Sequence, residues 1–207
     1  MSKNIKHLNI TYNQLLLYGV HIGHSLSNSL LYTAWLVYTY IDKLLIINLY
    51  KSILLWKSGL FCIANACKYK SPIWFINLDT SYSVAIKYAA YQAGEVSLTD
   101  NWIHGFLSNF LVFATVYKNL RKYSFLSYNG RQKWVISKRQ EWFLTRNTWP
   151  RLIFVSNVKK SYWPVREALN LGIPCFGVVD TNTFCDFISL PFPGNDDSMN
   201  CISFYIE

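Results

Sequence analysis

Acidic side chains near the carboxyl end of the chain have the types and spacing of a magnesium site. Asp180, Thr181 and Asn182 follow an apolar run, and Asp196 and Asp197 follow a Gly-Asn pair further along. Oxygen ligands at the carboxyl end of a strand can hold Mg²⁺, so a Mg²⁺-dependent phosphoryl-transfer enzyme is one hypothesis. The same side chains also fit turns, because Asp and Asn cap backbone amides. The turn interpretation is favoured, since no matching carboxylate pair follows the first expected strand.

Two histidines, His21 and His24, flank Gly23 and could bind Zn²⁺ if further ligands converged on them. Cys62 and Cys67 are too loosely spaced to be assigned as those ligands. The pair is therefore interpreted as part of a turn whose imidazoles donate to backbone carbonyls or to phosphates. The sequence also lacks a Gly-x-x-x-x-Gly-Lys-Ser/Thr phosphate loop and a Gly-x-Ser-x-Gly nucleophile turn. We assign no catalytic residue, metal ligand or cofactor site.

Basic and aromatic side chains are better placed to bind nucleic acid. The chain has 20 Lys and Arg against 11 Asp and Glu, a formal net charge of +9. From residue 118 to residue 166 the only acid is Glu141, and Tyr, Phe and Trp are interleaved with the cations. Cations neutralise phosphates, and aromatic rings stack on unpaired bases. The residues predicted to contact phosphates are Lys118, Arg121, Lys122, Arg131, Lys133, Lys138 and Arg139. A second predicted set, in a turn cluster facing RNA or neighbouring proteins, is His21, His24, Asn101, Trp102 and His104.

The elements that must position these residues alternate along the chain. Continuous apolar runs predict strands at 44–49, 73–76, 152–155, 174–179 and 187–190. Helical spacing predicts helices at 11–18, 51–69, 80–93, 164–171 and 196–206, the third capped by Thr80 or Ser81 and the last with an acidic first turn. This alternation indicates an α/β fold with a doubly wound parallel sheet. We expect a single domain over residues 1–207, with a basic insertion at about 118–149.

Leu30 to Leu49 is the most apolar stretch and raises the question of a membrane span. Asp42 and Lys43 divide it into two runs, each too short to cross about 30 Å of hydrocarbon. Two buried strands and their connection fit better, and an integral membrane protein is the weaker alternative. The five cysteines are odd in number and irregularly spaced, which indicates reduced thiols. The first residues have the character of neither a secretory signal nor an import sequence.

Short blocks, taken in order, resemble the family of the second protein of the small ribosomal subunit, in its bacterial and organellar type. Residues 18–24 (YGVHIGH) resemble its AGVHFGH signature, and residues 42–51 (DKLLIINLYK) resemble its IINLEK strand. Residues 101–109 (NWIHGFLSN) resemble its RWLGGMLTN block. The remaining matches are REA at 166–168 with GIP at 172–174, VDTN at 179–182 and PFPGNDDS at 191–198. The chain departs from the family pattern where Ile41 and Asn101 replace arginines and His104 replaces a glycine.

The resemblance implies a flavodoxin-like α/β domain with a helical hairpin, here shortened, inserted before the fourth strand. It implies a structural ribosomal protein, without catalysis or an obligatory cofactor, that binds small-subunit rRNA where head meets body. The expected partners are this rRNA and neighbouring small-subunit proteins, with no membrane insertion and no homo-oligomer. The shortened hairpin leaves open whether the largest small-subunit protein is bound. A composition rich in Asn, Ile, Lys, Tyr and Phe favours an AT-rich organelle genome, and a mitochondrion rather than a plastid.

Overall fold

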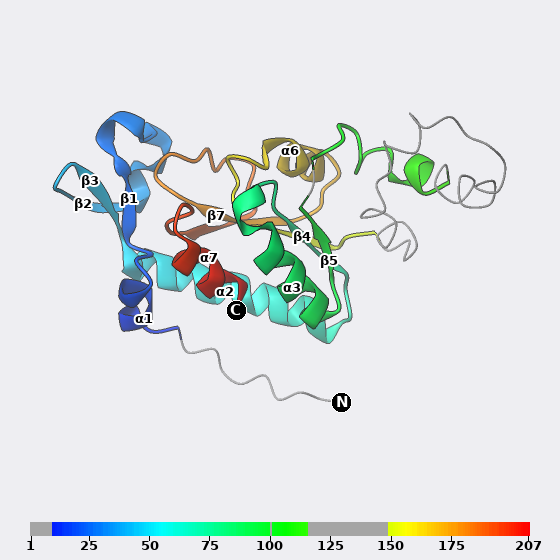
Figure 1. Ribbon diagram of the computed structural model, residues 1–207, viewed down its shortest axis with the longest axis horizontal. Coiled ribbons are helices and arrows are strands. Elements are labelled where there is room, and N and C mark those ends of the chain that lie inside the picture. Colours follow the sequence, from blue (N-terminus) through cyan, green and yellow to red (C-terminus); the bar gives the residue numbers. More distant parts are fainter. Residues whose placement is uncertain (1–9, 100, 116–148) are drawn as a thin grey trace.

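The centre of the protein is a five-stranded parallel β-sheet (Figure 1). The computed structural model describes residues 10–99, 101–115 and 149–207. The strands of the sheet are β4 (Ile73–Ile76), β5 (Val96–Leu98), β6 (Leu152–Val155), β7 (Cys175–Val179) and β8 (Leu190–Pro193). Across the sheet their order is β5-β4-β6-β7-β8. Counted along the chain this is 2-1-3-4-5, the order of flavodoxin-like folds.

Helices cover both faces of this sheet, which confirms the predicted doubly wound α/β fold. Side chains alternate along β6, so that Ile153 and Val155 belong to one core while Leu152 and Phe154 belong to the other. The first core is covered by α6 (Tyr162–Asn170) and residues 106–114. The second is covered by α1 (Tyr12–Leu17), α2 (Leu49–Lys68), α3 (Ser83–Ala93) and α7 (Met199–Ile206). Figure 1 shows α2, α3 and α7 on the side of the sheet opposite to α6.

Residues 30–49 contain two strands and their connection, as expected, but the strand at 37–41 is largely exposed and both strands belong to a second, antiparallel sheet. Its strands, in order across the sheet, are β1 (Ile22–Ser25), β3 (Leu44–Ile47) and β2 (Val37–Ile41). Two short 3₁₀ helices, η1 (Leu26–Asn28) and η2 (Leu31–Leu36), lie between β1 and β2. Asp42 and Lys43 have positive φ angles of 49° and 67°, which suit a two-residue hairpin turn. The chain therefore reverses here, and 44–47 pairs within the hairpin instead of joining the parallel sheet.

Local sequence signals set several helix ends. Thr11 forms a capping box at the start of α1, and the chain turns after this helix at Gly19, whose φ is 78°. Asn48 Oδ1 accepts hydrogen bonds from two backbone N–H groups and begins α2. Gly94, with a φ of 72°, ends α3 as predicted. The predicted cap of that helix is wrong, because the Asp79 side chain caps a 3₁₀ turn, η3 (Thr80–Tyr82), that precedes α3.

The carboxyl-terminal elements begin later than predicted. The strand expected at 187–190 is β8, four residues long, at Leu190–Pro193. The helix expected at 196–206 begins only at Met199 and has no acidic residue in its first turn. Asp196 is instead buried in the preceding turn, where its N–H donates to the Asp180 carboxylate at 3.3 Å. The edge strand β5 was not predicted, because three residues are too few to give a pattern.

Three further expectations concern the cysteines, a membrane span and the basic insertion. All five cysteines are free thiols, and Cys175 and Cys201 are buried. Within the described residues, no helix has the length and apolar character needed to cross a membrane. Residues 118–148 of the expected insertion lie outside the described part of the chain, and with them the seven basic residues predicted to contact phosphates. The insertion and the single-domain organisation therefore stay predictions.

Gly59 allows α2 to approach β8. A Cβ at this position would lie 2.1 Å from Cε1 of Phe192, whose ring stacks on Trp56 with centroids 4.6 Å apart. We expect Gly59→Ala to lower the free energy of unfolding by about 1–3 kcal/mol through overpacking, although alanine is the better helix former. Urea unfolding followed by circular dichroism measures the change. Ser58→Ala, at the neighbouring exposed position, is the control and should change stability by less than about 0.5 kcal/mol. A Gly59→Ala protein as stable as the parent would contradict this packing.

Candidate functional site

Polar side chains collect where the strands of the parallel sheet end. Buried examples are Asn77, Asp79, Ser156, Asp180 and Asp196. Open α/β sheets bind their ligands at this edge, in the crevice where the strand order reverses. That crevice lies here between β4 and β6. What the edge can do chemically depends on what these side chains already contact.

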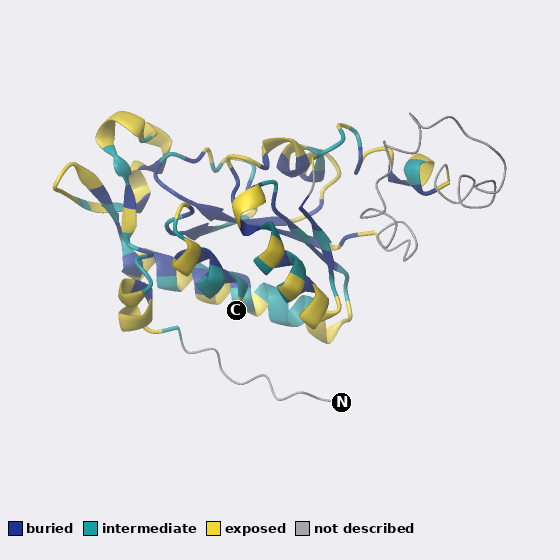
Figure 2. Ribbon diagram, viewed as in Figure 1, coloured by how far each residue is buried: buried dark blue, intermediate teal, exposed yellow. Residues whose placement is uncertain are grey.

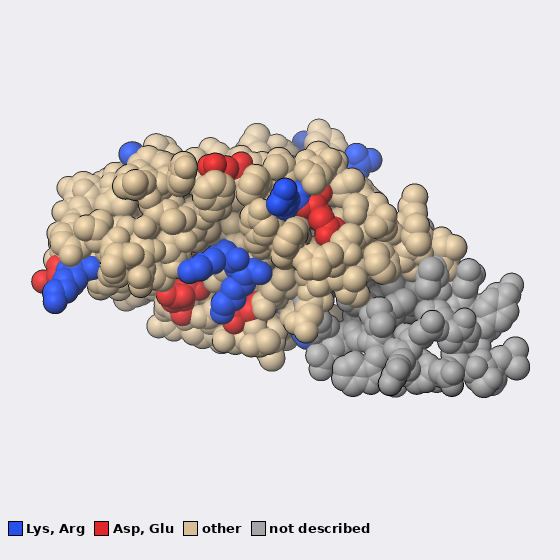
Figure 3. All heavy atoms as spheres, turned by 90° about the horizontal axis from the view of Figure 1, so that it is seen from above, with Lys and Arg blue, Asp and Glu red and all other residues tan. Residues whose placement is uncertain are grey.

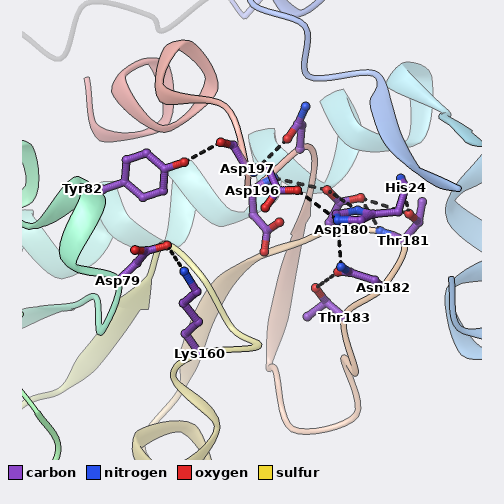
Figure 4. Close-up of polar contacts among 11 residues, drawn as sticks. His24, Asp79, Tyr82, Lys160, Asp180, Thr181, Asn182, Thr183, Asp196 and Asp197 are labelled. Carbon is purple, nitrogen blue, oxygen red and sulfur yellow. Dashed lines mark hydrogen bonds and ion pairs between the residues drawn. The ribbon is translucent and has the colours of Figure 1, made fainter. Parts of the chain in front are cut away.

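Across this crevice the side chains hydrogen-bond to one another. Ser156 Oγ donates to Asn77 Oδ1 at 2.9 Å, and Asn77 Nδ2 donates to the carbonyl oxygen of Asp79 at 2.7 Å. The ammonium group of Lys160 pairs with the Asp79 carboxylate (Figure 4). Burial opposes ionisation of Asp79, but hydrogen bonds from Lys160 and Ser81 outweigh it, so the pKa of Asp79 is lowered. The charge of Lys160 is therefore used in an ion pair within the protein.

Asp180, at the end of β7, is fully buried and connects three segments (Figure 4). Its Oδ1 accepts hydrogen bonds from the backbone N–H and the hydroxyl of Thr181. Its Oδ2 accepts from the N–H of Asp196 and lies 3.3 Å from Nδ1 of His24. Both oxygens of the first carboxylate in the magnesium hypothesis are therefore engaged by groups of the protein.

The His24 imidazole lies between two carboxylates. Its Nε2 is 3.0 Å from Oδ2 of Asp197 and 2.9 Å from Nδ2 of Asn182, while Nδ1 faces Asp180. The hydrogen-bonding contact with Asp180 raises the pKa of His24; burial acts against this, and the charges of Asp180 and Asp197 add to it. The two carboxylates favour the protonated imidazole, which carries a donor on each nitrogen, whereas the Asn182 amide nitrogen is itself a donor and favours an unprotonated Nε2. When protonated, His24 offsets part of the negative charge of the cluster.

Asp196 is buried beside the other two carboxylates. Burial, followed by repulsion from Asp180 and Asp197, raises the pKa of Asp196 to about 7. Among the described residues there is no group of three His, Cys, Asp or Glu side chains placed to hold a metal ion. The Asp180 carboxylate accepts the N–H groups of Thr181 and Asp196, and Asn195 Oδ1 accepts the N–H of Asp197, which agrees with the turn interpretation.

The antiparallel sheet is attached to the parallel sheet through the loop after β7. The backbone N–H of His24 donates to Thr181 Oγ1 at 2.9 Å. Thr33 Oγ1 and the N–H of Leu30 donate to the Thr181 carbonyl at 2.6 and 2.9 Å. Gly23 permits this approach, because a Cβ there would lie 2.7 Å from Thr181 Cγ2. This glycine, His24 and the Asp-Thr-Asn turn therefore act together as one joint between the two sheets.

A second polar contact holds the loop at residues 101–107 against α6. The Glu167 carboxylate accepts three hydrogen bonds from this loop. Oε1 accepts from Trp102 Nε1 at 2.9 Å and from the N–H of Gly105 at 2.7 Å, and Oε2 accepts from the N–H of Leu107 at 2.9 Å. Gly105 has a φ of 81°, which a side chain would strain. One carboxylate thus shapes the whole turn.

The residues predicted to form one turn cluster lie in two places. His24 lies in β1 and His21 directly precedes it, whereas Trp102 contacts Glu167 and His104 contacts Trp163, both in α6. Asn101 is the neighbour of Trp102 in the chain. Figure 1 shows β1 and α6 at separate places in the molecule. Asn101 and His104 are exposed, while Trp102 is half-buried. Both sets lie next to a glycine turn, but one turn leads into β1 and the other follows β5. The two turns belong to different parts of the fold, so the two sets do not meet.

The two remaining histidines differ in their surroundings. His21 Nδ1 is buried and has no hydrogen-bond partner within the described part of the chain, and burial lowers the pKa of His21. His104 packs edge-on against Trp163 of α6, with ring centroids 4.6 Å apart. His104 is therefore a surface packing residue in this structure.

Sequence reasoning missed the residues that organise these contacts. Glu167 stood out only as part of a matching block, because a carboxylate that accepts backbone N–H groups leaves no spacing signal. Lys160 was counted with the basic stretch, since nothing in the sequence links it to Asp79. One feature of the sequence could have drawn attention to Glu167. Residues 118–166 are rich in Lys and Arg, whereas from Glu167 to the end of the sequence the only charged residues are acids.

Charge is divided unevenly between the described and undescribed parts of the chain. The described residues contain ten Lys and Arg and nine Asp and Glu. Figure 3 shows the charged side chains of one face as small, separate groups on a largely uncharged surface. Residues 116–148, outside the described part, hold eight Lys and Arg against one Glu. The net charge of the protein is therefore carried mainly by that segment.

Comparison with known proteins gives a consistent result. A family model described as "Ribosomal protein S2" matches residues 15–207. The small ribosomal subunit protein uS2 of Ehrlichia ruminantium (strain Gardel) is 28% identical over 202 residues, covering 91% of this chain and 71% of the relative. That of Colwellia psychrerythraea is 26% identical over 214 residues, covering 96% and 88%. That of Rickettsia akari is 29% identical over 217 residues, covering 98% and 73%.

The buried carboxyl of Asp196 makes stability depend on pH. Its pKa is 3.8 when unperturbed and about 7 in the folded chain, so stability is lost as pH rises from about 4 to about 7. We expect Asp196→Asn to be more stable than the parent at pH 8, by up to about 4 kcal/mol, with the difference shrinking toward pH 4. Urea unfolding at several pH values measures this difference.

Asp186→Asn, at an exposed position, is the control and should leave the pH profile unchanged. His24 acts in the same direction, because its raised pKa gives stability that is lost as pH rises above its ordinary range. If the difference between Asp196→Asn and the parent were the same at pH 4 and pH 8, the assignment of Asp196 would be wrong.

Proposed function

Because the chain belongs to the ribosomal protein S2 family, it is a structural constituent of the small ribosomal subunit, and we propose that it binds small-subunit rRNA mainly through its basic segment 116–148. The observation that carries the proposal is the division of charge. The described residues nearly balance, with ten cations and nine acids, whereas the segment holds eight cations and one acid. RNA affinity depends on cations that neutralise phosphates, so that segment is where such affinity would reside.

The chemistry of the segment suits folded RNA with unpaired bases. Lys and Arg release condensed counterions when they contact phosphates, and aromatic rings stack on exposed bases. The proposed phosphate contacts are Lys118, Arg121, Lys122, Arg131, Lys133, Lys138 and Arg139. The aromatic residues among them are Tyr123, Phe125, Tyr128, Trp134, Trp142 and Phe143.

The parallel sheet serves as a scaffold and not as an enzyme. Asp79 and Lys160 neutralise each other at the crevice between β4 and β6, and the Asp180 oxygens are engaged by groups of the protein. The phosphoryl-transfer hypothesis for Asp180, Asp196 and Asp197 has no support from the family, which is structural. The Asp180 carboxylate instead accepts backbone N–H groups from two turns.

The smaller sites are proposed to contribute in two ways. The exposed side chains of Asn101 and His104 would contact rRNA or a neighbouring protein, where Glu167 holds their turn. His21, His24 and Trp102 would act by positioning, since each is partly buried. The proposed place of the protein, at the junction of head and body, follows from the family resemblance.

We further propose that the subunit is mitochondrial. The support is compositional: 15 Tyr and 13 Phe accompany many Asn, Ile and Lys residues, as expected for an AT-rich genome. The relatives described above are bacterial. Mass spectrometry of small subunits purified from mitochondria of the source organism is the direct test. Finding the chain in that inventory would support the proposal, and finding it only in another compartment would overturn it.

The salt dependence of RNA binding tests the basic segment. We expect the triple variant Lys133→Gln, Lys138→Gln, Arg139→Gln to reduce the slope of log Kd against log salt by about 2–3, since each lost phosphate contact removes about 0.7–0.9. Fluorescence anisotropy with small-subunit rRNA at several KCl concentrations measures the slope. The matched control, Lys57→Gln, Lys68→Gln, Lys70→Gln, removes the same charge from exposed positions of the described part. Equal losses in both triple variants would refute a localised site.

A further inference from the structure

The antiparallel sheet and the connection before β2 carry an unusual number of exposed apolar side chains. Leu31 is 92% exposed and Tyr38 is 70% exposed, and Tyr32, Tyr40 and Ile41 are each more than half exposed. Figure 2 shows much of this end of the molecule in yellow, projecting away from the parallel sheet. Tyr38 and Tyr40 share one side of β2, Ile41 lies on its other side, and Leu31 and Tyr32 lie in η2; we call these five residues together the hairpin face. A group of exposed apolar residues at one end of a protein is typical of a contact surface.

The hairpin face is held by a well-anchored backbone. Leu36 and Thr33 are buried within the same connection, and the Thr33 hydroxyl donates to the Thr181 carbonyl at 2.6 Å. Lys51 Nζ donates to the carbonyl of Trp35 at 2.8 Å, and the N–H of Asn48 donates to the carbonyl of Leu36 at 2.7 Å. Hydrogen bonds therefore hold the backbone that carries these exposed side chains, which reduces the conformational entropy lost when a partner binds.

The charge of this region argues against RNA as its partner. From residue 22 to residue 47 the only Lys, Arg, Asp or Glu residues are Asp42 and Lys43, which form the hairpin turn. Where the family has an arginine before the strand at 44–47, this chain has Ile41. RNA binding needs cations against the phosphates, and one cation beside one anion does not supply them.

The backbone of β2 argues against a lipid surface. β2 pairs with β3 alone in the described part of the chain, so its other edge presents N–H and C=O groups outward. Hydrocarbon cannot satisfy such groups, whereas a protein surface can. Tyrosine hydroxyls on the same face also need polar partners beside their apolar rings.

Resting on the role in the small subunit proposed above, we propose that the hairpin face docks an uncharged, apolar surface of a neighbouring protein of that subunit. The rings of Tyr38 and Tyr40 would pack against apolar side chains of the neighbour, and the edge of β2 would exchange hydrogen bonds with its backbone. Tyrosine is well suited to such contacts, because it buries a large area with few rotatable bonds.

Photo-crosslinking within the assembled particle tests the proposal. The full chain carries p-benzoylphenylalanine in place of Tyr38 and is built into reconstituted small subunits, which are then irradiated. We expect a nuclease-resistant adduct in which mass spectrometry identifies another protein of the small subunit. The same replacement at Tyr91, exposed on α3, is the control and should not give that adduct. An adduct with rRNA, with a second copy of the chain or with lipid, or no adduct, would overturn the proposal.

A double variant separates this inference from the role in RNA binding. Tyr38→Ser, Tyr40→Ser changes two exposed residues, so the fold should persist, which circular dichroism checks. We expect unchanged affinity of the isolated chain for small-subunit rRNA, but about tenfold weaker retention in salt-washed particles, as for loss of aromatic contacts at an interface. Unchanged retention would overturn the docking proposal alone. If the parent chain failed to bind rRNA, the proposed function would fail instead.

Discussion

The buried carboxylate of Asp180 is the constraint on which the arrangement of the molecule depends. A buried charge is costly unless donors surround it, and here the donors come from three separate segments. Thr181 supplies N–H and hydroxyl groups, Asp196 supplies an N–H, and the His24 imidazole adds an ion-pair contact, with Nδ1 3.3 Å from Oδ2. The end of β7, the turn before α7 and the strand β1 must therefore meet at one point, which fixes the second sheet on the first.

The remaining polar contacts at this edge follow the same rule. Asp79 is balanced by Lys160, and the Glu167 carboxylate is satisfied by N–H groups of the 101–107 loop. Asp180 and Glu167 thus shape turns of the α/β body, and the described part of the chain has little net charge because its cations and acids nearly balance. A neutral scaffold can carry a strongly basic segment without repelling it. This distribution of charge suits the proposed function, in which the described residues form the fold and the basic segment binds rRNA.

Sequence reasoning succeeded where a local signal matched the tertiary environment. The bounds of β4 and β6 were predicted to the residue, because all-apolar runs are what a doubly covered strand requires. It failed for 44–47, since an apolar run does not reveal whether a hairpin turn precedes it. The turn residues Asp42 and Lys43 are not glycine, so nothing in the sequence indicated their positive φ angles. Several residues of the site could be named from the sequence, but the contacts among them could not be predicted. Glu167 accepts backbone N–H groups, and such contacts depend on the fold and not on spacing.

The crevice between β4 and β6 has a consequence for how the domain is maintained. Flavodoxin-like folds commonly complete this region with a bound nucleotide or cofactor. Here Asn77, Ser156, Asp79 and Lys160 complete it by bonding among themselves. These four side chains therefore find partners within the protein, so the local fold at this edge does not need a ligand to supply them.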